Sequence, residues 1–221
     1  MIILLPPSET KRDGGTDERL DLSSFAFRRL RPRRAEVVRA VRTLSRDTGA
    51  SLVALRLSPA LGAVEIARNR RLTLSPTMPA LDRYTGVVFD GLDAPTLTDS
   101  QRSFAFSHVF IHSALFGPIS AGDLIPAYRL SHDSRLTGLP ASSTLKNHWA
   151  RPISAALSQA PGLLLDFRSE GYVDLGPVDS RPNSFFLRVF TVGDNGEKRA
   201  LNHFNKKAKG ELTRAIIDAL C

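Results

Sequence analysis

The chain has 221 residues, 42% of them hydrophobic and 24% charged, a composition typical of a soluble globular domain. No apolar run approaches the roughly 18–20 residues of a membrane span, and the opening run Met1–Leu5 is too short and lacks the basic residues of a signal peptide. The single cysteine, Cys221, excludes an internal disulfide framework and any zinc or redox motif built from paired cysteines. We therefore expect a cytoplasmic monomer that contacts no membrane and needs no cofactor.

The first third of the chain is predicted to contain one buried strand followed by helices. Ile2–Leu5 is an apolar run that stops at two prolines, as a short buried strand does. A polar loop follows. Further predicted elements are helices over residues 33–47, 50–57 and 60–71. The joint between the last two is short, which indicates a helical hairpin. We expect a helical insertion over residues 33–75 within a single domain that covers residues 1–221.

The remainder of the chain alternates predicted strands and helices. Thr98 and Gln101 have the spacing of a capping box, which predicts that a helix begins there. In chain order, the predicted elements are a strand at 84–89, a turn at 90–91, a helix to residue 108, a strand at 109–111, a helix at 146–157 with Pro152 inside, a strand at 163–167, and a hairpin of 185–192 and 198–204 around a turn at 193–196. This order favours an α+β class, with an α/β-like mixed sheet surrounded by helices in one compact domain.

The charge points to an anionic partner. Lysine plus arginine number 30 against 22 acidic residues, so the net charge is +8 and the pI is about 10.2, which favours binding to polyanions such as nucleic acid. Eight arginines and a single acid lie between Arg28 and Arg46. On a helical wheel, Arg39, Arg42 and Arg46 lie opposite the apolar positions. This stripe is either a solvated helix face or a surface that tracks phosphates.

Three of the six lysines, Lys206, Lys207 and Lys209, lie at the start of the last predicted helix. Asn205 is its predicted N-cap. Exposed cations at a helix N-terminus oppose the helix dipole, and a bound anion would reverse that effect. Residues 205–210 are therefore a candidate phosphate site, with three flexible surface lysines as the alternative. The predicted buried stripe of this helix is Ala208, Leu212, Ala215, Ile216 and Ala219.

Polar residues follow the first strand. Ser8, Glu9 and Lys11 come after it, and ligands in open α/β sheets bind beyond the carboxyl ends of strands. A hydroxyl, a carboxylate and an ammonium there can bind phosphate or perform acid–base chemistry, or can form an ordinary polar loop. Tyr128 with Arg129, Trp149 and Tyr172 are candidates for stacking and phosphate pairing, or for the core.

Familiar catalytic motifs are missing from the sequence. It contains no Walker A loop, no GxGxxG after a strand, no HExxH and no Gly-x-Ser-x-Gly elbow. His108 and His112 are four residues apart, as a metal pair on a helix would be, but they stand at a strand entry without a carboxylate partner. We therefore expect no metal site.

Short segments spread over nearly the whole chain carry a resemblance to a known family. In chain order they are Ile2–Lys11, Tyr84–Gly86, Phe89–Leu92, Ser113–Gly117, Ile125–Leu130, Asn147–Trp149, Ser169–Tyr172 and Asn205–Gly210. In this order and spacing they resemble the peroxide stress protein YaaA family. The opening Pro-Pro-Ser-Glu is similar to that of its shorter, high-GC branch.

The resemblance implies a cytosolic α+β protein with a positively charged cleft and a helix-hairpin-helix element suited to double-stranded DNA. Here that element would cover residues 50–72 and turn at residues 58–62, where only Gly62 of the usual Gly-x-Gly is present. The family's role implies bacterial protection against hydrogen peroxide, linked to lower intracellular free iron. No residues of this sequence form a recognisable iron site.

Three hypotheses follow for function. The first is a DNA-binding peroxide-defence protein without known catalytic activity, whose candidate phosphate contacts are Lys11, Arg39, Arg42, Arg46, Arg129, Asn205, Lys206, Lys207 and Lys209. The second is an enzyme acting on a nucleotide or a nucleic-acid base, or on another phosphate-bearing ligand, with candidate residues Ser8, Glu9, Lys11, Tyr128, Ser169 and Tyr172. The third is a basic scaffold for a protein partner. The second requires Glu9, Lys11, Arg129 and Lys206 to converge in one narrow pocket.

Overall fold

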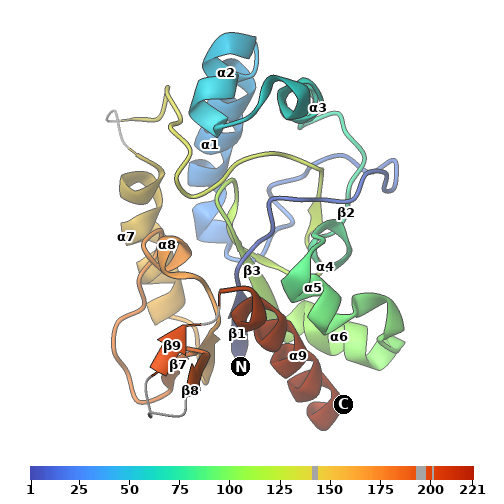
Figure 1. Cartoon of the computed structure of the whole chain (residues 1–221), viewed down its shortest axis with the longest axis vertical. Coiled ribbons are helices and arrows are strands. Elements are labelled where there is room, and N and C mark those ends of the chain that lie inside the picture. Colours follow the sequence, from blue (N-terminus) through green and yellow to red (C-terminus); the bar gives the residue numbers. More distant parts are fainter. Residues whose placement is uncertain (141–143, 193–197, 201) are drawn as a thin grey trace.

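A five-stranded mixed sheet lies at the centre of the computed structural model, which describes residues 1–140, 144–192, 198–200 and 202–221 (Figure 1). Its strand order is β4–β3–β1–β6–β7, in which only β4 is antiparallel to its neighbour. The bounds are β1 Ile2–Leu5, β3 Val109–Ser113, β4 Gly117–Ser120, β6 Leu164–Asp166 and β7 Ser184–Phe186. The strands predicted at residues 2–5, 109–111 and 163–167 are confirmed.

β1 is the middle strand, and this position explains its composition. It pairs in parallel with β3 on one side and with β6 on the other. Ile3, Leu4 and Leu5 have no exposed surface. A strand covered on both faces reads as a continuous apolar run rather than as an alternating one. The chain that leaves its carboxyl end therefore emerges at the middle of the sheet edge.

Helices surround this sheet (Figure 1). α1–α3 form the upper end in this view, α4–α6 and α9 lie at the lower right, and α7 and α8 at the left. Their bounds are α1 Arg31–Leu44, α2 Thr48–Leu55, α3 Pro59–Arg70, α4 Ala80–Arg83, α5 Val87–Leu92, α6 Asp99–His108, α7 Leu145–Ser158, α8 Glu170–Val173 and α9 Asn202–Leu220, with 3-10 turns at Arg28–Leu30 and Ala94–Thr96. Two short antiparallel pairs complete the fold, β2 Met78–Pro79 with β5 Leu124–Ile125 and β8 Phe190–Val192 with β9 Lys198–Ala200. The α+β class is confirmed.

The helices α1–α3 form close to where the sequence predicts them. The side chains of Asp47 and Ser58 cap α2 and α3 by accepting bonds from the Ala50 and Leu61 amides, and Pro59 stands in the first turn of α3. The axes of α2 and α3 are bent by 104° at their joint. Whether residues 33–75 form an insertion distinct from the rest of the domain stays a prediction.

The described α-helices range from 4 to 19 residues in length. None of them alone combines the length and the apolar composition that crossing a membrane needs. Only α2 and α3 taken together, across their bend, reach that length and composition.

The strand predicted over residues 84–89 and the turn at 90–91 are wrong. Tyr84 follows α4, and Gly86, at φ 96°, leads directly into α5. α5 instead packs against α9 at two glycines. A Cβ on Gly210 would overlap the Val88 carbonyl, and one on Gly91 would lie 2.7 Å from the Lys207 carbonyl oxygen. This backbone contact joins segments that lie far apart in the chain. The helical conformation of α5 therefore has no signal in the local periodicity of the sequence.

α9 also differs from its prediction. It begins at Asn202, so Asn205 lies inside the helix and is not its N-cap. The buried positions are Lys209, Gly210, Thr213 and Ile217, whereas Leu212 and Ala215 are exposed. The physical reason is the close approach of Gly210 to α5, which rotates the helix away from its most apolar stripe.

The predicted hairpin near the carboxyl terminus is partly confirmed. β8 and β9 pair antiparallel, with Thr191 opposite Arg199. The predicted turn at residues 193–196 lies outside the described residues. The predicted first strand at 185–192 divides in two, because β7 joins the main sheet beside β6 while β8 pairs with β9. Pro152, in contrast, lies inside α7 as predicted.

Candidate functional site

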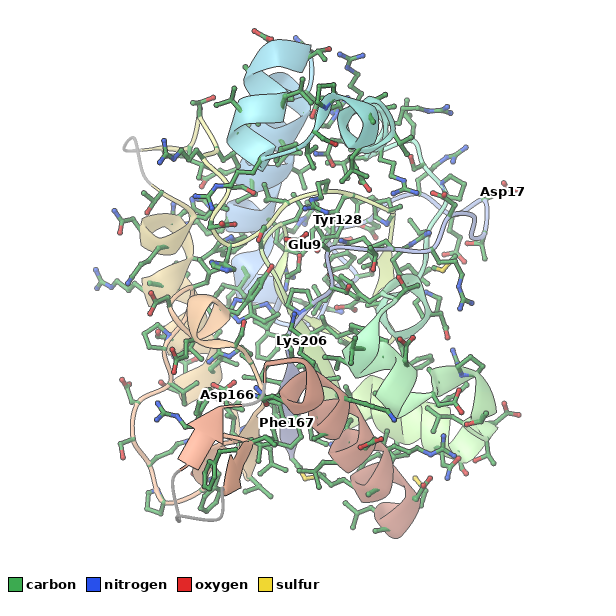
Figure 2. All side chains as sticks on the ribbon, viewed as in Figure 1. Glu9, Asp17, Tyr128, Asp166, Phe167 and Lys206 are labelled. Carbon is green, nitrogen blue, oxygen red and sulfur yellow. The ribbon has the colours of Figure 1, made fainter. Side chains whose placement is uncertain are left out.

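Polar residues gather at the carboxyl ends of the parallel strands. Ser8–Lys11 follow β1, Ser113 ends β3, and Arg168 follows β6. In Figure 2 Glu9 and Tyr128 lie next to each other, above Asp166 and Phe167 at the end of β6. This edge is where open α/β sheets bind ligands, because neighbouring parallel strands bring their loops together there. We call Glu9, Lys11, Glu65, Arg129 and the tyrosines Tyr84 and Tyr128 the lysine cluster.

Lys11 is the centre of the lysine cluster. The residue is 7% exposed, and its Nζ donates to the carbonyl oxygens of Ser8 at 3.0 Å and Glu9 at 3.2 Å. The same nitrogen lies 4.1 Å from the ring centroid of Tyr128 and 5.1 Å from that of Tyr84, within the range of cation–π attraction. Burial is the main cause that lowers the pKa of Lys11 to about 7, while the charge of Glu65 raises it in part. Lys11 is therefore able to hold or release a proton near neutral pH.

A chain of buried hydroxyls lies beside Lys11. The Tyr128 hydroxyl is 2.6 Å from both the Tyr84 hydroxyl and the Ser113 Oγ. The Ser113 Oγ accepts the amides of Leu115 and Phe116, both at 3.0 Å, so its own hydrogen goes to Tyr128. Tyr128 then donates to Tyr84. Burial raises the pKa of Tyr84 and Tyr128, so both hydroxyls stay protonated and serve as hydrogen-bond donors.

Within the lysine cluster, Glu9 and Arg129 form an ion pair. A carboxylate oxygen of Glu9 lies 2.5 Å from the Arg129 guanidinium, and their side chains are 58% and 12% exposed. α3 holds the Arg129 backbone: Asn69 accepts its amide at 2.9 Å and donates to its carbonyl at 2.8 Å. The guanidinium is thus fixed in place with a displaceable, solvent-facing carboxylate as its partner.

Glu65 is a site residue that the sequence analysis missed. Its side chain is 7% exposed, and its Oε1 accepts a hydrogen bond from Arg68 at 2.8 Å. Its Oε2 is buried and has no hydrogen-bond partner among the described residues. Arg68 also makes a bidentate pair with Asp13 in the loop after β1. The signal in the sequence is weak: Glu65 is the only acid between Asp47 and Asp82.

A second buried polar group lies after β6. Arg168 has no exposed surface and makes two bonds to the Asp166 carboxylate, at 2.8 and 2.6 Å. It also donates to the His112 Nδ1 at 2.7 Å. Burial, with the charge of Arg168, holds the pKa of His112 well below its usual range, so this imidazole is neutral. Arg168 thus joins β3 to the loop after β6.

The remaining candidate residues, Ser169, Tyr172 and Trp149, differ in their surroundings. Ser169 is exposed before α8, while Tyr172 is buried, with its ring 5.1 Å from that of His132 and its pKa raised by burial. Trp149 is a core residue that donates to the Ala114 carbonyl at 2.9 Å. Neither Ser169 nor Trp149 is among the hydrogen-bond or ring partners of the Lys11 Nζ, so the predicted gathering is only partial.

The three lysines of α9 differ in exposure. Lys206 and Lys207 are exposed, and Lys207 pairs with Glu211 at 3.3 Å. Lys209 is 5% exposed and donates to the Arg168 carbonyl at 3.2 Å. Burial lowers the pKa of Lys209. Because Lys209 faces the core, only the first two are placed to meet a ligand from solvent.

Arg39 and Arg42 lie on α1 as predicted, whereas Arg46 lies in the turn after it, because α1 ends at Leu44 and not at residue 47. Arg39, Arg42 and Arg46 are exposed, whereas Val37 and Val41 on the opposite face are buried. None of the three arginines makes an ion pair with a residue that the structure describes. Not all of the arginines between Arg28 and Arg46 are exposed, however. Arg34 is fully buried and donates to the carbonyls of Phe116 and Pro118 at 2.8 and 2.9 Å.

Two hollows on the surface of the described residues have a defined volume. One, of about 130 Å³, is lined by Arg12, Tyr84, Thr85, Asp90 and Asp93 among others, and the other, of about 270 Å³, by Glu18, Arg19, Asp21 and Asp123 among others. Neither of these two is lined by Glu9, Lys11, Arg129 or Lys206. Among the described residues, no group of three or more histidine, cysteine or acidic side chains is arranged to hold a metal ion.

The fold and site define an α+β protein with a buried lysine and its tyrosines at the carboxyl end of a mixed sheet. The chain belongs to the peroxide stress protein YaaA family, whose model matches residues 1–221. It is 42% identical over 217 residues to a UPF0246 protein of Corynebacterium efficiens, a match that covers 98% of this chain and 84% of that protein. A UPF0246 protein of Streptomyces coelicolor is 33% identical over 224 residues, covering 98% of this chain and 83% of that one. The predicted family is confirmed.

Proposed function

We propose that this protein acts in the peroxide response by binding DNA through a basic surface, and that it thereby limits iron-dependent oxidative damage in the bacterial cytoplasm. Membership of a peroxide stress family supports the first part. The observation that carries the DNA-binding part is the exposure of Arg39 and Arg42 on α1 and of Arg46 in the turn after it. None of the three forms an ion pair with a described residue. Phosphate contacts from such a face give affinity with little reading of base sequence.

We assign the phosphate contacts to α1 rather than to the α2–α3 hairpin. Val53, Leu61 and Val64 are exposed on α2 and α3, so the hairpin presents much apolar surface. The turn also lacks the full Gly-x-Gly of a phosphate-binding hairpin. Lys206 and Lys207 on α9 supply a second exposed basic position. A helix-hairpin-helix role for α2 and α3 remains part of the proposal, subordinate to α1.

Binding of a labelled duplex, measured by fluorescence anisotropy across a salt series, tests this proposal. Replacing Arg39, Arg42 and Arg46 by alanine should weaken binding to all sequences alike and lower the salt slope by up to about 3, close to one unit for each lost contact. The matched control replaces the exposed Arg12, Arg151 and Arg188, which removes the same charge elsewhere. Equal losses in both triple variants, or no loss in the first, would overturn the assignment to α1.

A second candidate function is an enzyme that acts on a nucleotide or a nucleic-acid base. The observation that favours it is the convergence of Glu9, Lys11, Arg129 and Tyr128 at one end of the sheet, with Lys11 able to change its protonation state near pH 7. A protein that only tracks the phosphate backbone has no need of a carboxylate beside a buried amine.

One experiment distinguishes the DNA-binding function from the enzyme candidate. Wild-type protein and Lys11→Met are incubated with a panel of nucleotides and nucleosides, and product formation is followed by chromatography and mass spectrometry. The enzyme candidate requires turnover by the wild type that Lys11→Met loses while duplex binding is retained. An inactive wild type across the panel, with duplex binding intact, supports the binding function alone.

A further inference from the structure

We infer that Lys11 is a carbonyl-reactive amine, which forms an imine with an aldehyde that carries a phosphate group, and that Glu65 accepts the proton released in that step. The inference concerns the same lysine cluster as the second candidate function and rests on it only for the choice of site. It does not depend on DNA binding.

The position of Lys11 sets it apart from the exposed lysines. Lys146 and Lys207 are solvent-facing and pair with Asp174 and Glu211. Lys11 is buried at the carboxyl end of the central strand, and no carboxylate among the described residues lies within ion-pair distance of its Nζ. Its fixed partners are two backbone carbonyls and two aromatic rings. A neutral amine has two N–H groups for those two carbonyls and keeps its lone pair for a carbon electrophile.

The protonation state of Lys11 also supports its assignment as a carbonyl-reactive amine. An amine reacts with a carbonyl only when it is neutral. With burial as the main cause, the pKa of Lys11 is lowered to about 7, so a large part of Lys11 is neutral at pH 7.4. An ordinary lysine, with a pKa near 10.4, is neutral in only about one molecule in a thousand at that pH.

Glu65 and the buried hydroxyls supply the proton transfers. The Oε2 of Glu65 is buried without a partner among the described residues, and the Glu65 charge is the largest single charge acting on Lys11. An unpartnered buried carboxylate oxygen is costly, which points to a missing donor in this space. Tyr84 stands at the end of the hydroxyl chain and faces Lys11 with its ring. Glu65 is thus the proton acceptor assigned to the amine, and the hydroxyl chain ends at a tyrosine whose ring contacts the amine.

The step is balanced without any further reagent. The Lys11 nitrogen attacks the aldehyde carbon, the nitrogen–carbon bond forms, and the nitrogen proton passes to Glu65. Glu65 returns that proton to the carbonyl oxygen, which becomes a hydroxyl. The second nitrogen proton then takes the same route to this hydroxyl, which leaves as water as the carbon–nitrogen double bond forms. One aldehyde and one amine thus give one imine and one water, and nothing is oxidised or reduced.

The arginine beside the amine defines the rest of the ligand. Arg129 is 12% exposed, and its partner is the solvent-facing carboxylate of Glu9. A phosphate can replace that carboxylate on the guanidinium, because arginine binds both anions through the same forked geometry. Such an aldehyde has two sources, a small phosphorylated aldehyde or an abasic sugar within a DNA strand. The shared chemistry is an aldehyde with a neighbouring phosphate.

Reductive trapping tests the inference on the wild-type protein. The protein is incubated at pH 7.4 with glyceraldehyde 3-phosphate and cyanoborohydride, and the modified lysine is located by peptide mass spectrometry. A second arm uses a duplex with one abasic site, and a third uses glyceraldehyde without phosphate. We expect Lys11 to be modified first, and faster with the phosphorylated than with the plain aldehyde. Modification of Lys206, Lys207 or the buried Lys209 in place of Lys11 would overturn the inference.

Variants separate the roles of the residues. Lys11→Arg should lose the fast adduct while keeping a positive charge. Glu65→Gln should slow trapping at Lys11 by at least about tenfold, in the range of a lost proton acceptor, and Glu65→Asp should restore part of the rate. A Lys146→Ala control, at an exposed lysine that pairs with Asp174, should trap at the wild-type rate. If neither phosphorylated aldehyde is trapped while Lys11→Met abolishes nucleotide turnover, the imine is wrong and the enzyme candidate survives. Trapping at Lys11 without any nucleotide turnover would support the imine and remove the enzyme candidate.

Discussion

The Glu9 carboxylate lies 2.5 Å from the Arg129 guanidinium, although 120 residues separate them in the chain. Glu9 stands in the loop after β1, and Arg129 is held by Asn69 of α3. The pair therefore ties the loop that carries Lys11 to the helical end of the molecule. It also neutralises the guanidinium best placed to bind an anion at this sheet edge.

Glu9→Gln should increase the affinity for inorganic phosphate, because it frees Arg129 from a competing carboxylate. The free energy of unfolding should change by less than about 1 kcal/mol, since the Glu9 side chain is 58% exposed and well screened. Isothermal titration with phosphate and urea unfolding measure the two effects. Glu170→Gln, which removes an exposed carboxylate beside Arg188, is the control. Weaker phosphate binding by Glu9→Gln would show that Glu9 is not a competitor.

Lys11 should make the stability of the protein depend on pH. Its pKa is about 7 in the folded state against 10.5 for an unperturbed lysine, so the unfolded chain binds more protons between these values. Stability therefore rises with pH from about 7 to 10.5, as the penalty for burying the charge is lifted, by at most about 1.4 kcal/mol per pH unit. Urea unfolding at pH 7 to 9.5 measures this slope. Lys11→Met should remove it, and parallel curves for the two proteins would contradict the shifted pKa.

Asp166→Asn should destabilise the protein by about 3–5 kcal/mol, because it leaves the fully buried Arg168 guanidinium without a countercharge. Denaturant unfolding measures the loss. The control is Asp174→Asn, which breaks the exposed pair with Lys146 and should cost less than about 1 kcal/mol. Similar costs for the two variants would mean that water reaches Arg168.

Gly210→Ala should destabilise the protein by about 1–3 kcal/mol, because the new methyl group meets the Val88 backbone and forces α9 away from α5. Thermal unfolding measures the change. Ala215→Ser, at an exposed position on the same helix, should stay within about 0.5 kcal/mol of the wild type. A neutral or stabilising Gly210→Ala would show that the two helices pack less closely than the structure has them.

Much of the fold could be predicted because its signals are local. The apolar run Ile2–Leu5 predicts a buried strand from four residues, and the Thr98–Gln101 capping box predicts the start of α6. The valines of α1 predict its buried face in the same way. The strand expected at residues 84–89 is wrong because the conformation there depends on a distant contact and not on a local signal. Its apolar residues fit a strand equally well, and contact with Gly210 of a distant helix selected α5.

In the candidate site, too, some features follow from local sequence signals and others from contacts between distant segments. Ser8, Glu9 and Lys11 could be singled out because they follow a predicted strand, and the sequence alone also determined the family, the basic charge and the arginine face of α1. Only the tertiary structure decided that Glu65 acts on Lys11, that Arg129 pairs with Glu9, and that Lys209 faces the core. The physical reason is that periodicity and capping depend on neighbours in the chain. Burial and the pairing of charges depend instead on which distant segments the packed core brings within a few ångströms of each other.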